Sequence, residues 1–133
     1  MLALMRSARV AVVLDVGCVL IFVIIGRASH TKGETLAGIA STSWPFLCGL
    51  AVGWAWLWAS AVRVSGVRAW RRPFAIFAIS PAGLMVWLCT VAVGMILRVI
   101  SGQGTAIAFI VVALAFLGLF LLGWRLIWGL VRR

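Results

Sequence analysis

Asp15, a single acidic residue inside an apolar segment, is the strongest candidate in this sequence for a chemical role. Asp15 interrupts an otherwise apolar stretch from Val10 to Ile25, which Arg9 and Arg27 flank. If this stretch crosses a bilayer as a helix, Asp15 lies about 9 Å beyond Arg9, at 1.5 Å per residue. An isolated charge at that depth is costly, so we expect the carboxyl group to be protonated, paired with a base or in contact with water.

Arg125 is the basic residue best placed to pair with Asp15. It precedes Arg132 by seven positions in the last apolar segment, on a helix that would run opposite to the first, and so reaches nearly the same depth. Three roles remain open for the two residues. They could form a structural ion pair between the first and last helices, or Asp15 could be a protonatable carrier site. Alternatively, Asp15 is protonated and Arg125 extends towards the bilayer surface.

Arg27, His30 and Arg98 form a second candidate site, on the other side of the membrane from Arg125. Arg27 ends the first apolar segment, His30 follows in a polar loop, and Arg98 lies in the last turn of the third segment. Guanidinium groups form paired hydrogen bonds with carboxylates and phosphates, so this cluster would attract an anionic or polar solute. The same arginines could instead bind lipid headgroup phosphates. His30 would add pH sensitivity near neutrality, or simply be solvated.

The remaining reactive residue types argue against an enzyme. The three cysteines lie one in each of three apolar segments without a Cys-x-x-Cys pattern, which disfavours a metal cluster or a disulfide framework. One histidine cannot supply two axial haem ligands, and no glycine-rich phosphate loop is present. Acid–base or metal-assisted hydrolysis would need several carboxylates within the membrane. We therefore expect no enzymatic activity, no cofactor and no metal.

The composition identifies the elements that must position these residues as membrane helices. Of the 133 residues, 65% are apolar and 11% are charged, whereas soluble domains average about 45–50% and about 25%. The mean hydropathy of +1.23 points the same way. A net charge of +10 would suggest a nucleic-acid partner for a soluble chain, but here the basic residues cluster between long apolar runs. The expected partner is therefore the lipid bilayer and not a nucleic acid.

Four apolar runs predict an all-α, polytopic membrane protein with one transmembrane domain over residues 1–133. The expected spans are 10–26, 43–62, 81–100 and 106–124. Pro45 falls in the first turn of the second span, and Thr105 is expected to cap the fourth. Ser80 and Pro81 predict the start of the third span. The segment Phe74–Ile79 is then either an interfacial lead-in or the first part of a single helix kinked at Pro81.

The distribution of basic residues predicts how the helices are oriented. With both termini in the cytoplasm (N-in/C-in), the inner side would hold Arg6, Arg9, Arg63, Arg68, Arg71, Arg72, Arg125, Arg132 and Arg133. The outer side would hold Arg27, Lys32 and Arg98. Basic residues favour the cytoplasmic side, and the basic loop after the second span could also bind anionic lipid headgroups.

Small and aromatic residues indicate how the helices pack. Gly49 and Gly53 form a small-xxx-small pair on the second span, which permits close contact within the chain or, as the alternative, between two copies. Trp124 falls near a predicted membrane interface, as the tryptophans of an aromatic belt do. Trp54 lies deeper and is expected to fill the core.

A set of short motifs resembles a known family when their order and spacing are considered together. The motifs are Gly26-Arg27-Ala28-Ser29-His30, Pro45-Phe46, Arg98 and Gly123-Trp124-Arg125, in addition to Asp15. They resemble an uncharacterised family of short, tryptophan-rich bacterial membrane proteins classed as a domain of unknown function. The resemblance covers nearly the whole chain and implies a four-helix protein of the bacterial inner membrane. It implies no activity.

These observations leave two alternative functions open. The first is a transporter or channel for a small polar or anionic solute, attracted by Arg27, His30 and Arg98, with Asp15 and Arg125 as a charge gate that could exchange protons. Such a protein would need a homodimer or a larger assembly, because four short helices enclose little space. The second is a non-catalytic accessory subunit of a larger membrane complex, in which the charge pair only holds helices together.

Overall fold

Four apolar helices make up the structure, a computed structural model that describes residues 2–28, 35–65 and 77–132. They are α1 (Leu2–Ala28), α2 (Leu36–Ser65), α4 (Leu84–Ile100) and α5 (Ile107–Val131), with a short π-helical segment, η2 (Ile79–Gly83), leading into α4. Each is long and apolar enough to cross a bilayer, if η2 is counted with α4. The prediction of an all-α protein with four transmembrane helices is confirmed, and the described ranges contain no strand.

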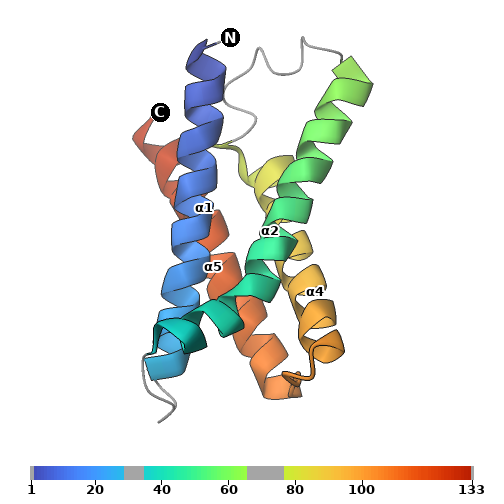
Figure 1. Ribbon diagram of the computed structural model, residues 1–133. Coiled ribbons are helices and arrows are strands. Elements are labelled where there is room, and N and C mark those ends of the chain that lie inside the picture. The colour runs from blue at the N-terminus through green and yellow to red at the C-terminus, as the bar shows by residue number, and fades with distance from the viewer. Residues whose placement is uncertain (1, 29–34, 66–76, 133) are drawn as a thin grey trace.

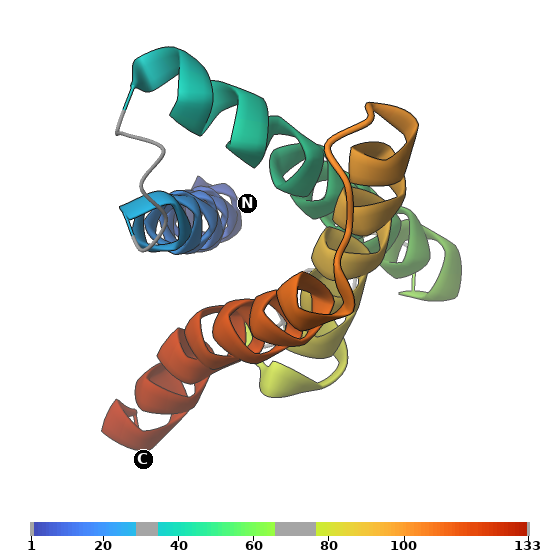
Figure 2. The same ribbon diagram turned by 90° about the horizontal axis from the view of Figure 1, so that it is seen from below.

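Successive helices run in opposite directions, so both chain termini lie at one end of the structure (Figure 1). α2 packs most extensively against α4, while α1 contacts both α2 and α5. Seen along the helices, α1 lies beside α2 and α5 and apart from α4 (Figure 2). This arrangement brings the first half of α1 to the same level as the last half of α5.

The helices extend beyond the apolar spans that the sequence predicts. α1 begins at Leu2, ahead of the span 10–26, and α5 continues to Val131, beyond the span 106–124. An apolar run marks the part of a helix inside the hydrocarbon, whereas the helix itself can continue into the headgroup region. The span bounds and the helix bounds are therefore different quantities.

Pro45 lies well inside α2 and not in its first turn, so that prediction is wrong. The helix begins earlier because Thr35 caps it: the Gly38 N–H donates to Thr35 Oγ1 at 3.1 Å, and the Ile39 N–H donates to the Thr35 carbonyl at 2.9 Å. Proline has no N–H, so the carbonyl of Ser41, four residues earlier, loses its helical donor. α2 bends after its first turns (Figure 1), as expected for an internal proline.

Ser80 interrupts the helical path immediately ahead of Pro81. Its backbone is extended (φ −120°, ψ 132°), as is usual for a residue before proline. Phe77 is buried, and its ring lies against Trp124 and Trp128 of α5 with centroid separations of 5.7 and 4.8 Å. The end of the predicted lead-in therefore packs against α5, inside the protein. Residues 74–76 lie outside the described ranges.

The connection between α4 and α5 is a turn that requires glycine. Gly102 and Gly104 have φ values of +74° and +77°, in the left-handed region that residues with a Cβ rarely adopt. The prediction that Thr105 caps the next helix is wrong. Ala106 occupies the N-cap position in an extended conformation, and no side chain caps α5.

All four helices contribute to one buried apolar core. Its members are Val19, Phe22, Val23, Phe46, Leu50, Val86, Val91, Ala113, Leu117 and Leu121. Large apolar side chains are also exposed along the helices, for example Val13 at 68% and Leu119 at 66%. Such side chains suit a surface that faces lipid and not water.

Gly49 and Gly53 bring the backbones of α2 and α4 into close contact. A Cβ built on Gly49 would lie 2.7 Å from the Thr90 carbonyl oxygen, and one on Gly53 would lie 3.1 Å from the Val86 Cα. The sequence allows Gly49 and Gly53 to contact either a helix of the same chain or a second copy. In the structure they contact α4 of the same chain. The contact uses backbone atoms, which cannot move aside as a flexible side chain can.

Replacement of Gly49 by Val is expected to destabilise the protein by about 1–3 kcal/mol, because the new side chain would overlap the α4 backbone. The measurement is the thermal unfolding midpoint of the protein in detergent. Gly17→Val is the matched control, since a Cβ at Gly17 meets no atom within 4 Å. Equal midpoints for the two variants would contradict this description of the α2–α4 contact.

Candidate functional site

The structure brings Asp15 of α1 and Arg125 of α5 together in a fully buried ion pair. Arg125 Nη1 lies 2.7 Å from Asp15 Oδ1, and Arg125 Nη2 lies 2.8 Å from Asp15 Oδ2. Both side chains are 0% exposed. The contact is bidentate, the geometry in which a guanidinium and a carboxylate interact most strongly.

Two tryptophans complete the surroundings of the carboxylate. The indole N–H of Trp54, on α2, donates to Oδ2 at 3.0 Å, and that of Trp124, on α5, donates to Oδ1 at 2.9 Å. An ionised carboxylate has about four acceptor positions, and four donors now occupy them. Side chains from three helices therefore meet at the one carboxylate of Asp15.

The Arg125 side chain makes further contacts at its stem and at its guanidinium group. Its Nη1 group also donates to the Leu121 carbonyl at 2.8 Å, and its guanidinium lies 4.3 Å from the centroid of the Trp124 ring. Gly83 makes room for the stem, because a Cβ there would lie 2.9 Å from Arg125 Cδ. Arg125 is thus fixed in one position by polar, aromatic and steric contacts.

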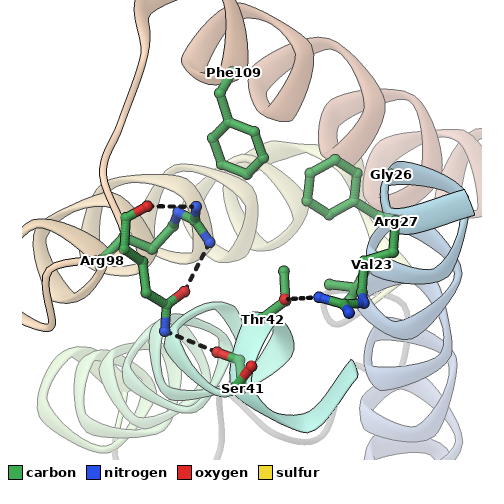
Figure 3. A pocket seen from close by; sticks show the side chains of 9 residues that line it. Val23, Gly26, Arg27, Ser41, Thr42, Arg98 and Phe109 are labelled. Atoms are coloured by element: carbon green, nitrogen blue, oxygen red, sulfur yellow. Dashed lines mark hydrogen bonds between the residues drawn. The ribbon is translucent and has the colours of Figure 1, made fainter. Parts of the chain in front are cut away.

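A pocket of about 530 Å³ lies at the other end of the structure, where α1 and α4 end and α2 and α5 begin (Figure 3). Its lining residues are Phe22, Val23, Gly26, Arg27, Ser41, Thr42, Arg98, Gln103 and Phe109. In Figure 3, Arg27 and Arg98 approach the pocket from opposite sides. These are two of the three residues predicted for the outer site. His30, the third, lies outside the described residues. Asp15 and Arg125 do not line this pocket.

Arg27 reaches across from α1 to the first turns of α2. Its Nη1 group donates to Thr42 Oγ1 at 3.0 Å, and Thr42 Oγ1 donates to the Gly38 carbonyl at 2.9 Å. Gly38 leaves room for this contact, because a Cβ there would lie 2.6 Å from Arg27 Cζ and would displace the guanidinium. The guanidinium passes directly over the backbone of α2.

Arg98 is held by the turn between α4 and α5. Its Nη1 group donates to Gln103 Oε1 at 2.9 Å, its Nε to the Gly104 carbonyl at 3.3 Å, and its Nη2 to the Gln103 carbonyl at 3.4 Å. The guanidinium also lies 4.4 Å from the centroid of the Phe109 ring. Gln103 Nε2 in turn donates to the Ser41 carbonyl at 2.8 Å, which is the carbonyl that Pro45 leaves without a helical donor.

Among the described residues that line the pocket, the charged ones are Arg27 and Arg98. The acceptors around Arg98 are neutral amide and carbonyl oxygens, and the acceptor on Arg27 Nη1 is a hydroxyl. Two guanidinium groups at one concave site can bind an anion, because both can act as donors to it. Among the described residues, no group of three or more His, Cys, Asp or Glu side chains could hold a metal ion.

Sequence reasoning misses four residues of these two sites. Trp54 and Trp124 are not simply core filler and interface anchor, since both donate to Asp15. The sequence does contain a signal for these two contacts. An indole N–H within a bilayer needs an acceptor, and Asp15 is the acidic residue within the predicted spans. Gln103 is the only side-chain amide in the sequence, which marks it as unusual. Nothing in the sequence distinguishes Gly38 from the other glycines.

The comparisons with known proteins bear on the family and not on the activity. Residues 12–128 match the family model described as Protein of unknown function (DUF3054). No curated protein and no solved structure matches the chain. The matched range contains Asp15, Arg27, Arg98 and Arg125, and the resemblance to an uncharacterised family is confirmed. The chain therefore belongs to the DUF3054 family of proteins of unknown function.

Proposed function

We propose that this multi-pass membrane protein binds a small anionic solute between Arg27 and Arg98 and transports it. The observation that carries the proposal is the pocket itself, in which two guanidinium groups from different helices line one space of about 530 Å³ and none of the described lining residues is acidic. An anion in this pocket would replace water around both charges and receive paired hydrogen bonds. Pockets of about 300–1,000 Å³ are usual for small-molecule ligands.

In this proposal the Asp15–Arg125 pair is a structural link and not a gate. Its support is the saturation of the carboxylate by four donors and the complete burial of both side chains. The described partners of the carboxylate are two indole N–H groups and two guanidinium nitrogens, all of them donors, so none of them could accept a proton from it. A proton-exchanging gate would instead need an acceptor or water at this position.

The second candidate function is an accessory subunit of a larger membrane complex. The observation that favours it is that Asp15 and Arg125 are fully buried and line neither the pocket beside Arg27 and Arg98 nor a second pocket that includes Arg9, Trp54 and Trp58. Native mass spectrometry of protein extracted from its own membrane separates the two candidates. A stable complex with other subunits would favour the accessory role, whereas a homodimer that also takes up a labelled anion in proteoliposomes would favour transport.

We further propose that the protein lies in the bacterial cytoplasmic membrane with both termini in the cytoplasm. The support is that both termini lie at the same end of the structure (Figure 1), where the sequence also places nine of its twelve basic residues. The basic loop that contains Arg68, Arg71 and Arg72 lies outside the described residues.

Replacement of Arg98 by Gln is expected to weaken anion binding at least tenfold, because the charge and its paired donors are lost. The measurement is the rise of the thermal unfolding midpoint in detergent with added sodium phosphate or sodium acetate at constant ionic strength. Arg6→Gln, at an exposed position near the other end of α1, is the matched control and should bind as the unchanged protein does. If phosphate, acetate and the larger organic anion benzoate all leave the midpoint of the unchanged protein where it is, the proposal is wrong.

Replacement of Asp15 or Arg125 alone by Leu is expected to destabilise the protein by about 3–5 kcal/mol, because each change leaves a buried charge without its partner. The double variant should be more stable than either single variant, since both charges are then removed together. The free energy of unfolding in detergent provides the measurement. Single variants as stable as the unchanged protein would rule out a structural role for the pair.

The orientation predicts the behaviour of reporter proteins fused after Arg133. Green fluorescent protein should fluoresce there, because it folds in the cytoplasm, and alkaline phosphatase should be inactive, because it needs an oxidising compartment for its disulfides. Insertion of the same two reporters between Thr31 and Lys32 should give the reverse result. An active phosphatase at the C-terminus would overturn the N-in/C-in orientation.

A further inference from the structure

The pocket between Arg27 and Arg98 has two chemically different parts. One part is polar and consists of the two guanidinium groups, the Ser41 and Thr42 side chains and the Gln103 amide. The other part is apolar and consists of Phe22, Val23 and Phe109. A ligand that uses the whole pocket must therefore carry a charged group and an apolar body.

The apolar part is built from aromatic rings that hold one another in place. Phe22 and Phe46 meet edge to face with centroids 5.4 Å apart, and Phe109 lies 6.4 Å from Phe22 and 6.2 Å from Phe46. Phe22 is 4% exposed and Phe46 is 0% exposed, so this cluster is anchored in the core. It offers a preformed apolar surface directly beside the charge of Arg98, whose guanidinium lies over Phe109.

A small inorganic anion would use only part of this site. It could bind the guanidinium groups, but it would fill little of the volume of about 530 Å³ and would not contact the partly exposed ring of Phe109. Burial of an apolar group there would contribute roughly in proportion to the area removed from water. The pocket is therefore better matched to an organic anion than to free phosphate or sulfate.

We propose that the ligand is an amphiphilic organic anion, with a carboxylate or phosphate between Arg27 and Arg98 and an aromatic ring or short alkyl chain against Phe22 and Phe109. This inference rests on the proposed function and specifies its substrate class. The same chemistry could come from a water-soluble organic acid or from the headgroup and chains of an anionic phospholipid.

Three matched probes separate the contributions of charge and apolar body. Sodium acetate carries the charge alone, benzyl alcohol carries the ring alone, and sodium benzoate carries both. We expect benzoate to bind at least tenfold more tightly than either of the others, measured by calorimetry in detergent at constant ionic strength. Equal binding of acetate and benzoate would overturn this inference and leave the proposed function intact. The absence of binding by any anion would overturn both.

Two variants locate the apolar part of the ligand. A Cβ at Gly26, which lines the pocket, meets no atom within 4 Å, so Gly26→Leu adds volume at the wall without a steric conflict. It should weaken benzoate binding more than acetate binding, whereas the control Gly17→Leu, with the same open space but outside the pocket, should change neither. Phe109→Ala should likewise reduce the preference for benzoate to less than threefold. An unchanged preference in both pocket variants would overturn the inference.

A lipid titration identifies the source of the anion. Short-chain phosphatidylglycerol and phosphatidylcholine have matched chains and differ in net charge. If phosphatidylglycerol displaces benzoate from the unchanged protein and Arg98→Gln weakens the direct binding of phosphatidylglycerol at least tenfold, the site takes a lipid. If benzoate binds and neither lipid displaces it, the site takes a water-soluble acid. Both results support an amphiphilic anion, whereas equal displacement by the two lipids would overturn the requirement for negative charge.

Discussion

The carboxylate of Asp15 accepts hydrogen bonds from two other helices, and the relative positions of α1, α2 and α5 depend on it. Within a bilayer, helices gain little from hiding apolar surface from one another, because the lipid is equally apolar. Polar contacts and close packing must therefore fix their positions. A shift of α1 by one residue along its axis would move Asp15 away from Arg125, Trp54 and Trp124 together, so this contact specifies one register for three helices.

The position of α4 depends on a different kind of contact. α4 contributes no donor to Asp15. Steric fit places it against α2, since Gly49 and Gly53 let the two backbones approach closely, and the Trp87 indole N–H of α4 donates to the Leu114 carbonyl of α5 at 3.1 Å. The ion pair and the glycine contact fix the helices in different ways. A buried ion pair is costly to misalign, whereas a glycine contact depends on the exact shape of the neighbouring backbone. α2 takes part in both, through Trp54 and the glycines.

The sequence predicts the four helices and the candidate residues better than it predicts their local partners. Hydropathy is averaged over long segments, so the predicted number of spans does not depend on the correct placement of individual residues. The ionisable residues are few, and depth alone matches Asp15 to Arg125. The partners of Arg98 could not be predicted, because they depend on the path of the turn that contains Gln103. The position of Pro45 within α2 could not be predicted either. The first turns of α2 are polar, so the apolar run that predicts the span begins after the start of the helix.

The hydrogen bond between Gln103 and the Ser41 carbonyl has a mechanical consequence. It joins the segment of α2 that precedes the bend at Pro45 to the turn that holds Arg98. If the first turns of α2 swing about this proline, they must either carry Gln103 with them or break a 2.8 Å contact. The position of one arginine of the pocket is thereby coupled to a hinge in a neighbouring helix, which would make occupancy of the pocket and the tilt of that segment mutually dependent.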